Sequence, residues 1–337
     1  MTGRGNVAGV RRWLRRHPIA VSALATAIAA AGALLIAHVT GAEAIGRAFD
    51  EIVPGWIALI AGAELLTYPA YAIAYRSVAC VHGHVPLTLP LATRIVAAGF
   101  GPFHVAGGFG IDKQALHALH EDERSARVRV LGLGILEWAL LAPTTCIVSI
   151  VLLAQGADVL PSLLWPWAIA VPVGLGFALW ASAPSRRERL ARIGGRRRAW
   201  LADLLDGVGV LHELLAHPIR YWGAWLGTAL YWIADITAFY AALRTFGLHL
   251  DVEKLILAYA TGYAATRRSL PLAGAGVTEV LMSYALYWVR QPLAPALAAV
   301  VAYRAFNFLL AAMPALLARR HVEPLLEAAD EMRRRAA

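Results

Sequence analysis

Charged residues and cysteines are scarce in this sequence. Only 16% of the 337 residues are charged and 59% are apolar, whereas an average soluble domain has about 25% charged residues. A soluble core of this size could not bury such an excess of apolar side chains. Cys80 and Cys146 both lie in apolar stretches, so the sequence predicts neither a disulfide framework nor a thiolate metal site.

Several motifs of catalytic and metal-binding proteins are also missing. The sequence contains no Walker lysine motif and no Gly-x-Ser-x-Gly nucleophile elbow. His212 and Glu213 do not form a zinc motif, because Ala216 stands where the second histidine would be needed. Asp203 and Asp206 lack the surrounding pattern of membrane enzymes that transfer phospho-alcohols. We therefore expect no metal and no cofactor, and we favour a protein that is not an enzyme over one that is.

The apolar residues are gathered into stretches of about twenty, the length that an α-helix needs to cross a bilayer. Together with a mean hydropathy of +0.58, this predicts an all-α, polytopic integral membrane protein, a helical bundle that forms a single membrane domain over residues 1–337. The first stretch is too long for a cleaved signal peptide, so we expect it to be retained. Continuous spans are expected at 18–39, 54–79, 127–153, 158–181, 219–243 and 294–318.

The arginines predict the orientation of these spans. The formal net charge is +9, and arginines gather before the first span, after the fourth and after the last. Because basic loops stay in the cytoplasm, we expect a cell inner-membrane protein with both termini cytoplasmic. The polar stretch 182–217 mixes a basic run with leucine and valine at helical spacing, which predicts a cytoplasmic amphipathic linker on the inner leaflet.

Two further apolar segments are interrupted by proline and glycine. Pro102 and several glycines break 86–120, and Pro271 and further glycines break 253–290. The orientation of the neighbouring spans requires each segment to enter the membrane and return to the same side. The sequence therefore predicts two inverted repeats, about 54–153 and 219–318, each with a re-entrant broken-helix hairpin.

The two breaks are the candidate binding site. Polar backbone at hydrocarbon depth is tolerated only where protein covers it or where it lines a wet cavity, and helix N-termini that follow a break attract anions. Charged residues at this depth are costly and often functional. The candidate substrate-binding residues are Arg94, Gly107, Gly108, Gly110, Asp112, Glu137, Arg267, Arg268, Gly274, Gly276, Glu279 and Arg304.

Structural explanations for these residues stay open. Glycines in membrane helices also serve close packing, and Arg94 can extend to lipid headgroups. Glu137 can form a hydrogen bond between helices, or an ion pair with Arg304. At Arg267 and Arg268 a shallower position would make both ordinary interfacial arginines.

The run SLPLAGAGVTEVLMSYAL, with the Tyr-Arg span that follows it, resembles the lysylphosphatidylglycerol synthase transmembrane region family, also called flippase-like. The matching positions are Pro271, Gly274, Gly276, Glu279, Tyr303, Arg304 and Pro314. The run GPFHVAGGFGIDKQAL, with Glu137, resembles the earlier element of the family. Alanines 273 and 275 stand where glycine is usual, and 112–114 lack the arginines common there, so the resemblance leaves the substrate open.

This resemblance implies lipid handling. We expect a membrane lipid transporter or flippase that binds an anionic headgroup between the two hairpins, with membrane lipids as partners and no nucleic acid. Lysine transfer in the family belongs to a separate soluble domain, which the chain ending at Ala337 is not expected to carry. Two alternatives stay open: a membrane-embedded enzyme that modifies a lipid headgroup or lipid-linked sugar, with Glu279 or Glu137 as general base, and a non-catalytic accessory subunit of an envelope-lipid pathway.

Overall fold

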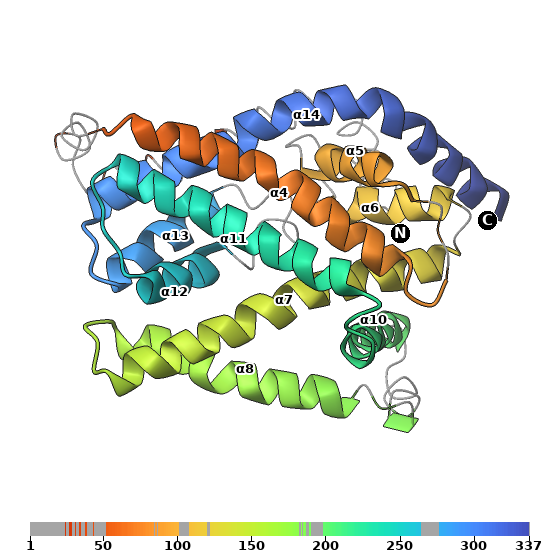
Figure 1. Ribbon diagram of the computed structural model, residues 1–337, viewed down its shortest axis with the longest axis horizontal. Helices are drawn as coiled ribbons and strands as arrows, with labels where there is room; N and C mark the ends of the chain where they lie inside the picture. The colour runs from red at the N-terminus through yellow and green to blue at the C-terminus, as the bar shows by residue number, and fades with distance from the viewer. Residues whose placement is uncertain are drawn as a thin grey trace, which may run out of the picture. The chain divides into compact units, whose positions relative to one another are not determined.

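The computed structural model describes residues 52–83, 85, 87–100, 108–119, 122–181, 198–263 and 276–336, with isolated positions within 24–43 and 183–189. Every secondary-structure element in these ranges is a helix (Figure 1). The helices are α4 (Gly55–Ala79), α5 (Leu89–Phe100), α6 (Gly108–Ala118), α7 (Glu123–Ala154), α8 (Pro161–Ala181), α10 (Arg198–Ala216), α11 (Trp222–Thr245), α12 (Val252–Tyr263), α13 (Val277–Trp288) and α14 (Leu293–Ala336).

Five of the described helices are long and apolar enough to cross a membrane: α4, α7, α8, α11 and the part Leu293–Ala318 of α14. They correspond to five of the six predicted continuous spans, and the prediction of a multi-pass helical membrane protein is confirmed. The remaining predicted span, 18–39, which is the first in the chain, falls almost entirely outside the described residues.

Local sequence explains where the long helices begin and end. Asp122 caps α7 by accepting a hydrogen bond from the backbone N–H of Ser125 at 3.0 Å. Beyond the ends of α7 and α11 stand Gly156 and Gly247, with φ of 60° and 71°, a left-handed conformation that glycine adopts without steric cost. Helix α7 therefore extends a turn further toward its N-terminus than hydropathy alone predicted.

Both interrupted segments contain two short helices instead of one long one. The segment 86–120 contains α5 and α6, and the segment 253–290 contains α12 and α13. With 12 residues at most, each is shorter than the roughly 20 residues of a full crossing. The breaks themselves, 101–107 and 264–275, lie outside the described residues. The re-entrant course and the inverted repeats stay predictions.

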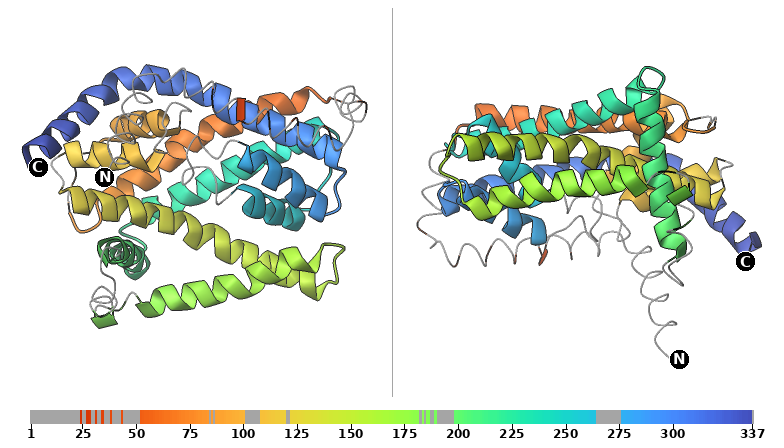
Figure 2. Two further views of the ribbon diagram at one scale, coloured as in Figure 1. Left: turned by 180° about the vertical axis from the view of Figure 1, so that it is seen from behind. Right: turned by 90° about the horizontal axis from the view of Figure 1, so that it is seen from below.

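The helices α12 and α13 pack closely against each other (Figure 2). A Cβ atom placed on Gly262 of α12 would lie only 2.5 Å from the Cα atom of Met282 on α13. Glycine at this position therefore lets the two backbones approach, as small residues do between membrane helices.

The chain divides into two compact units. Unit 1 consists of Met1–Leu65, Ala97–Ile111 and Asp235–Arg319, and unit 2 of Leu66–Val96, Asp112–Ala234 and Arg320–Ala337. The aromatic core of unit 1 includes Phe239, whose ring centre lies 5.4 Å from that of Tyr303. In unit 2 the rings of Tyr71 and Tyr231 meet edge to face at 5.2 Å. Each unit takes residues from both predicted repeats.

Within unit 2, α10 packs against α7, and α8 lies along α7 (Figure 1). Two glycines allow the close approach of α10: a Cβ atom on Gly132 would lie 2.6 Å from Cγ1 of Val210, and one on Gly207 would lie 3.1 Å from Cδ1 of Ile135. The predicted amphipathic linker thus contains a helix whose apolar face packs on protein. In contrast, only 11% of the span in α8 is buried, so most of its apolar surface is free to face lipid.

Candidate functional site

The N-terminus of α13 is shaped by Gly276 and Glu279. Gly276 has a φ of 81°, which a residue with a side chain rarely adopts. Its N–H group donates a hydrogen bond of 2.6 Å to Oε2 of Glu279, the third residue of the helix. Glu279 therefore reaches back to cap its own helix, as glutamate at this position commonly does.

The other carboxylate oxygen of Glu279 binds Arg304. The Nε atom of Arg304, on α14, donates a hydrogen bond of 2.9 Å to Oε1, and the two side chains are only 4% and 2% exposed. The guanidinium group also lies 4.7 Å from the ring centre of Phe308. Because a lone buried charge is strongly destabilising, each member of this pair depends on the other. Two residues that the sequence proposed for the site thus lie together, joining α13 to α14.

Asp235 forms a second polar cluster in unit 1. This fully buried aspartate on α11 accepts a hydrogen bond of 2.6 Å from the hydroxyl of Tyr259 and one of 2.7 Å from that of Tyr303. Each phenol donates to a different carboxylate oxygen. The cluster ties α11 to α12 and α14.

Glu64 and Asn307 form a third buried polar contact in unit 1. The amide of Asn307 on α14 donates a hydrogen bond of 2.9 Å to Oε2 of Glu64 on α4. The buried charged side chains described in unit 1 are thus three carboxyls and one guanidinium.

Glu137 and Asp112, two further candidates, belong to unit 2. The carboxylate of Glu137 accepts a hydrogen bond of 2.5 Å from the hydroxyl of Tyr71, and its backbone oxygen accepts one of 3.1 Å from the indole N–H of Trp232. Asp112 is fully buried, and its backbone oxygen accepts a hydrogen bond of 2.8 Å from Tyr75. An ion pair between Glu137 and Arg304 stays a prediction.

The remaining candidates are partly described: Gly108, Gly110 and Arg94 lie on short helices, and the others fall outside the described residues. Gly108 and Gly110 form the first turn of α6. Arg94 is exposed on α5, which agrees with the alternative that its side chain extends to headgroups. The candidates that fall outside the described residues are Gly107, Arg267, Arg268 and Gly274.

Sequence reasoning missed the tyrosines of these clusters. Tyr71 and Tyr259 were given no role, although a tyrosine in an apolar helix needs a partner for its hydroxyl group. Their partners lie 66 and 24 residues away in the chain, on other helices. The signal that could have found them is a tyrosine in an apolar helix that packs beside a span with a buried acidic residue.

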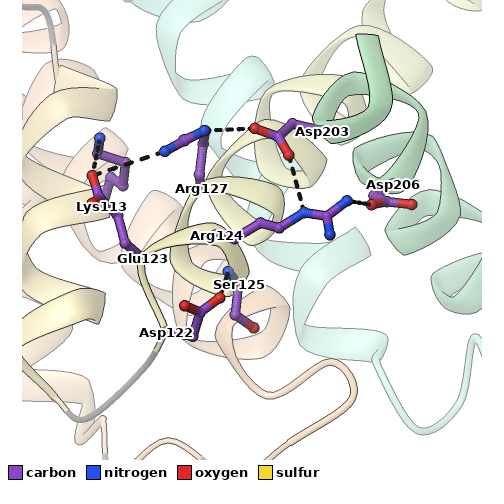
Figure 3. Close-up of polar contacts among 8 residues, drawn as sticks. All are labelled: Lys113, Asp122, Glu123, Arg124, Ser125, Arg127, Asp203 and Asp206. Carbon is purple, nitrogen blue, oxygen red and sulfur yellow. Dashed lines mark hydrogen bonds and ion pairs between the residues drawn. The ribbon is translucent and has the colours of Figure 1, made fainter. Parts of the chain in front are cut away.

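It also missed a chain of six charged side chains in unit 2, here called the charge ladder: Lys113, Glu123, Arg127, Asp203, Arg124 and Asp206 (Figure 3). The sequence pattern suggests only an incomplete enzyme motif at Asp203 and Asp206. Their spacing of three residues on α10 matches that of Arg124 and Arg127 on α7, which is the signal that could have paired them.

The sequence profile of the family described as Lysylphosphatidylglycerol synthase TM region matches residues 22–315. No curated protein matches the sequence. The matched range includes both interrupted segments and every candidate residue, and it ties this multi-pass membrane protein to lipid handling. The chain therefore belongs to the lysylphosphatidylglycerol synthase TM region family.

Proposed function

We propose that the protein is a membrane lipid transporter, a flippase, that holds an anionic headgroup beside the two broken segments, near Gly108 and Gly274. The observation that carries this proposal is the composition of unit 1. The residues that flank the first break, within Ala97–Ile111, cluster with those that flank the second, within Asp235–Arg319. Segments on the two sides of the chain's middle, near Gly108 and near Gly274, thus contribute to one compact unit, whose interior includes buried charged side chains.

The chemistry of the helix ends supports an anionic ligand. Helices α6 and α13 begin directly after the breaks, and the free N–H groups of a helix N-terminus attract negative charge. The carboxylate of Glu279 would repel an anion at α13, but its pairing with Arg304 offsets that charge. Arg267 and Arg268 would supply positive charge for the headgroup.

Movement of the lipid would follow the plan of other transporters with inverted repeats. One repeat would rock against the other and open the headgroup site to each leaflet in turn, while the acyl chains stay in the bilayer. The exposed apolar surface of helices such as α8 suits contact with lipid throughout that motion. In this proposal the protein lies in the inner membrane with both termini in the cytoplasm.

The geometry of Glu279 favours transport over the enzymatic alternative. A general base needs a free oxygen within reach of the proton that it removes. Both carboxylate oxygens of Glu279 accept hydrogen bonds, and the side chain is 2% exposed. Glu137 is also buried and engaged by Tyr71. We therefore assign Glu279 the task of holding Arg304 and the start of α13.

Transport can be tested in reconstituted vesicles that contain fluorescent phosphatidylglycerol, with a membrane-impermeant quencher to report the outer leaflet. We expect the protein to accelerate leaflet exchange of this anionic lipid several-fold more than that of fluorescent phosphatidylcholine. The double variant Arg267→Ala, Arg268→Ala should lose most of this acceleration, whereas Arg220→Ala, which changes an exposed arginine on a turn, should keep it.

The proposal would be contradicted if folded protein did not raise the rate of leaflet exchange of any anionic lipid above the rate in protein-free vesicles. Full activity in the double arginine variant would mean that the protein is a transporter whose headgroup site does not include Arg267 and Arg268. Chemical conversion of the added lipid that stops in Glu279→Gln would favour the enzymatic alternative.

A further inference from the structure

The charge ladder joins three helices that are separate in the chain. It alternates in sign from Lys113 on α6 through Glu123 and Arg127 on α7 to Asp203 on α10, and then through Arg124 to Asp206 (Figure 3). The N···O distances along it are 3.3, 3.9, 2.6, 3.2 and 2.9 Å. Each interior member therefore has an opposite charge on both sides.

Asp203 is the hub of the ladder. Its carboxylate is 6% exposed and contacts two guanidinium groups, those of Arg127 and Arg124. A carboxylate buried to this extent is stable only when it is paired and hydrogen-bonded. Since the glycine contacts described above also bring the backbones of α7 and α10 together, the first turns of α7 and the helix α10 form one firmly held body.

Lys113 extends the ladder to α6. Its ammonium group lies 3.3 Å from Oε1 of Glu123, and the two side chains are 26% and 36% exposed. Lys113 stands three residues after Gly110, in the helix that follows the first break. The ion pair thus connects the body formed by α7 and α10 to α6, the helix that follows the first break.

We propose that the charge ladder is a positioning device, in which α10 and the start of α7 hold α6 through Lys113. An isolated ion pair on a surface contributes little to stability. Here the exposed pair is the last step of a network whose hub is buried, and Arg127, which binds that hub, lies 3.9 Å from Glu123. Lys113, Glu123 and Asp203 are accordingly positioning residues.

Hydrogen–deuterium exchange of the full-length protein in detergent tests the device without any lipid substrate. In Lys113→Glu the ion pair becomes a repulsion, and we expect amides of the peptide covering α6 to exchange about 3- to 10-fold faster. Lys113→Arg should exchange as the unaltered protein does, because it keeps the charge. In the charge-swapped double variant Lys113→Glu, Glu123→Lys, the amides of α6 should exchange more slowly than in Lys113→Glu alone.

Asp203→Asn tests the hub. It should speed exchange in α6 as well as in α10, because Glu123 shares Arg127 with Asp203. The matched control is Arg220→Glu, which makes the same change of charge as Lys113→Glu on an exposed residue of unit 2 outside the ladder. High salt should also speed exchange in α6, since ions screen partly exposed pairs.

Unchanged exchange in α6 for both Lys113→Glu and Asp203→Asn would overturn the proposal, and so would equal acceleration in Arg220→Glu. The consequence for lipid movement rests on the proposed function: variants with faster exchange in α6 should show altered leaflet exchange of phosphatidylglycerol. If α6 loosens as expected and the protein moves no lipid, the charge ladder stands and the proposed function fails.

Discussion

At the scale of single residues, the interior of unit 1 is held by charges that need each other. Glu279 and Arg304 were found from the sequence by their depth in apolar segments and by their match to the family motif. Their pairing was not predicted, because hydropathy and motif spacing give no information on which side chains of different helices meet. The hydrogen bond from Gly276 to Glu279 was equally out of reach, since it depends on a backbone with positive φ.

The ion pair predicts a large cost for removing one charge. Glu279→Gln keeps the size of the side chain but leaves the guanidinium of Arg304 buried without its carboxylate, so we expect a loss of about 3 to 5 kcal/mol of stability. Thermal unfolding in detergent measures this loss. The double variant Glu279→Met, Arg304→Met should recover most of it, because two apolar side chains replace both charges. A Glu279→Gln protein as stable as the unaltered chain would contradict this account.

The cluster around Asp235 predicts smaller, separable effects. Tyr259→Phe and Tyr303→Phe each remove one donor to the carboxylate and should each cost about 1 to 3 kcal/mol, measured by the same unfolding experiment. Tyr240→Phe is the matched control, since its ring packs against Trp56 at 5.8 Å outside this cluster. Equal stability of all three variants would mean that the hydrogen bonds to Asp235 contribute nothing.

At the scale of elements, hydropathy located the long helices well and their ends less well. Spans of about twenty apolar residues dominate the signal, but the start of α7 is set by the cap at Asp122, in a polar stretch that hydropathy ignores. The breaks were also visible, because proline and glycine interrupt the apolar pattern. The packing of α10 on α7 was not visible in the sequence, because the apolar face of an amphipathic helix can contact either lipid or protein.

Glycine contacts give a prediction for helix packing. Gly262→Ala should destabilise the protein by about 1 to 3 kcal/mol, because its Cβ atom would meet the backbone of Met282. Gly174→Ala on α8 is the control: open space surrounds that position, so alanine should be neutral or stabilise the helix by up to about 1 kcal/mol. The midpoints of thermal unfolding of the two variants measure this difference. Equal midpoints would contradict the close packing of α12 on α13.

At the scale of the whole molecule, the class of protein and its family followed from the sequence. The inverted repeats and the course of the broken segments rest on counting crossings, a global argument that local structure does not test. The grouping of the flanks of both breaks in unit 1 is a tertiary fact that no local pattern contains. It gives physical support to a shared interior, on which the proposed lipid site depends.

Thiol labelling from each side of the membrane tests that shared interior most directly. Single cysteines would replace Phe103 and Leu272, in the two breaks, in a chain lacking Cys80 and Cys146. An impermeant maleimide should label position 103 from the cytoplasmic side and position 272 from the outer side, and anionic lipid should protect both. Labelling of both positions from the same side would contradict the account.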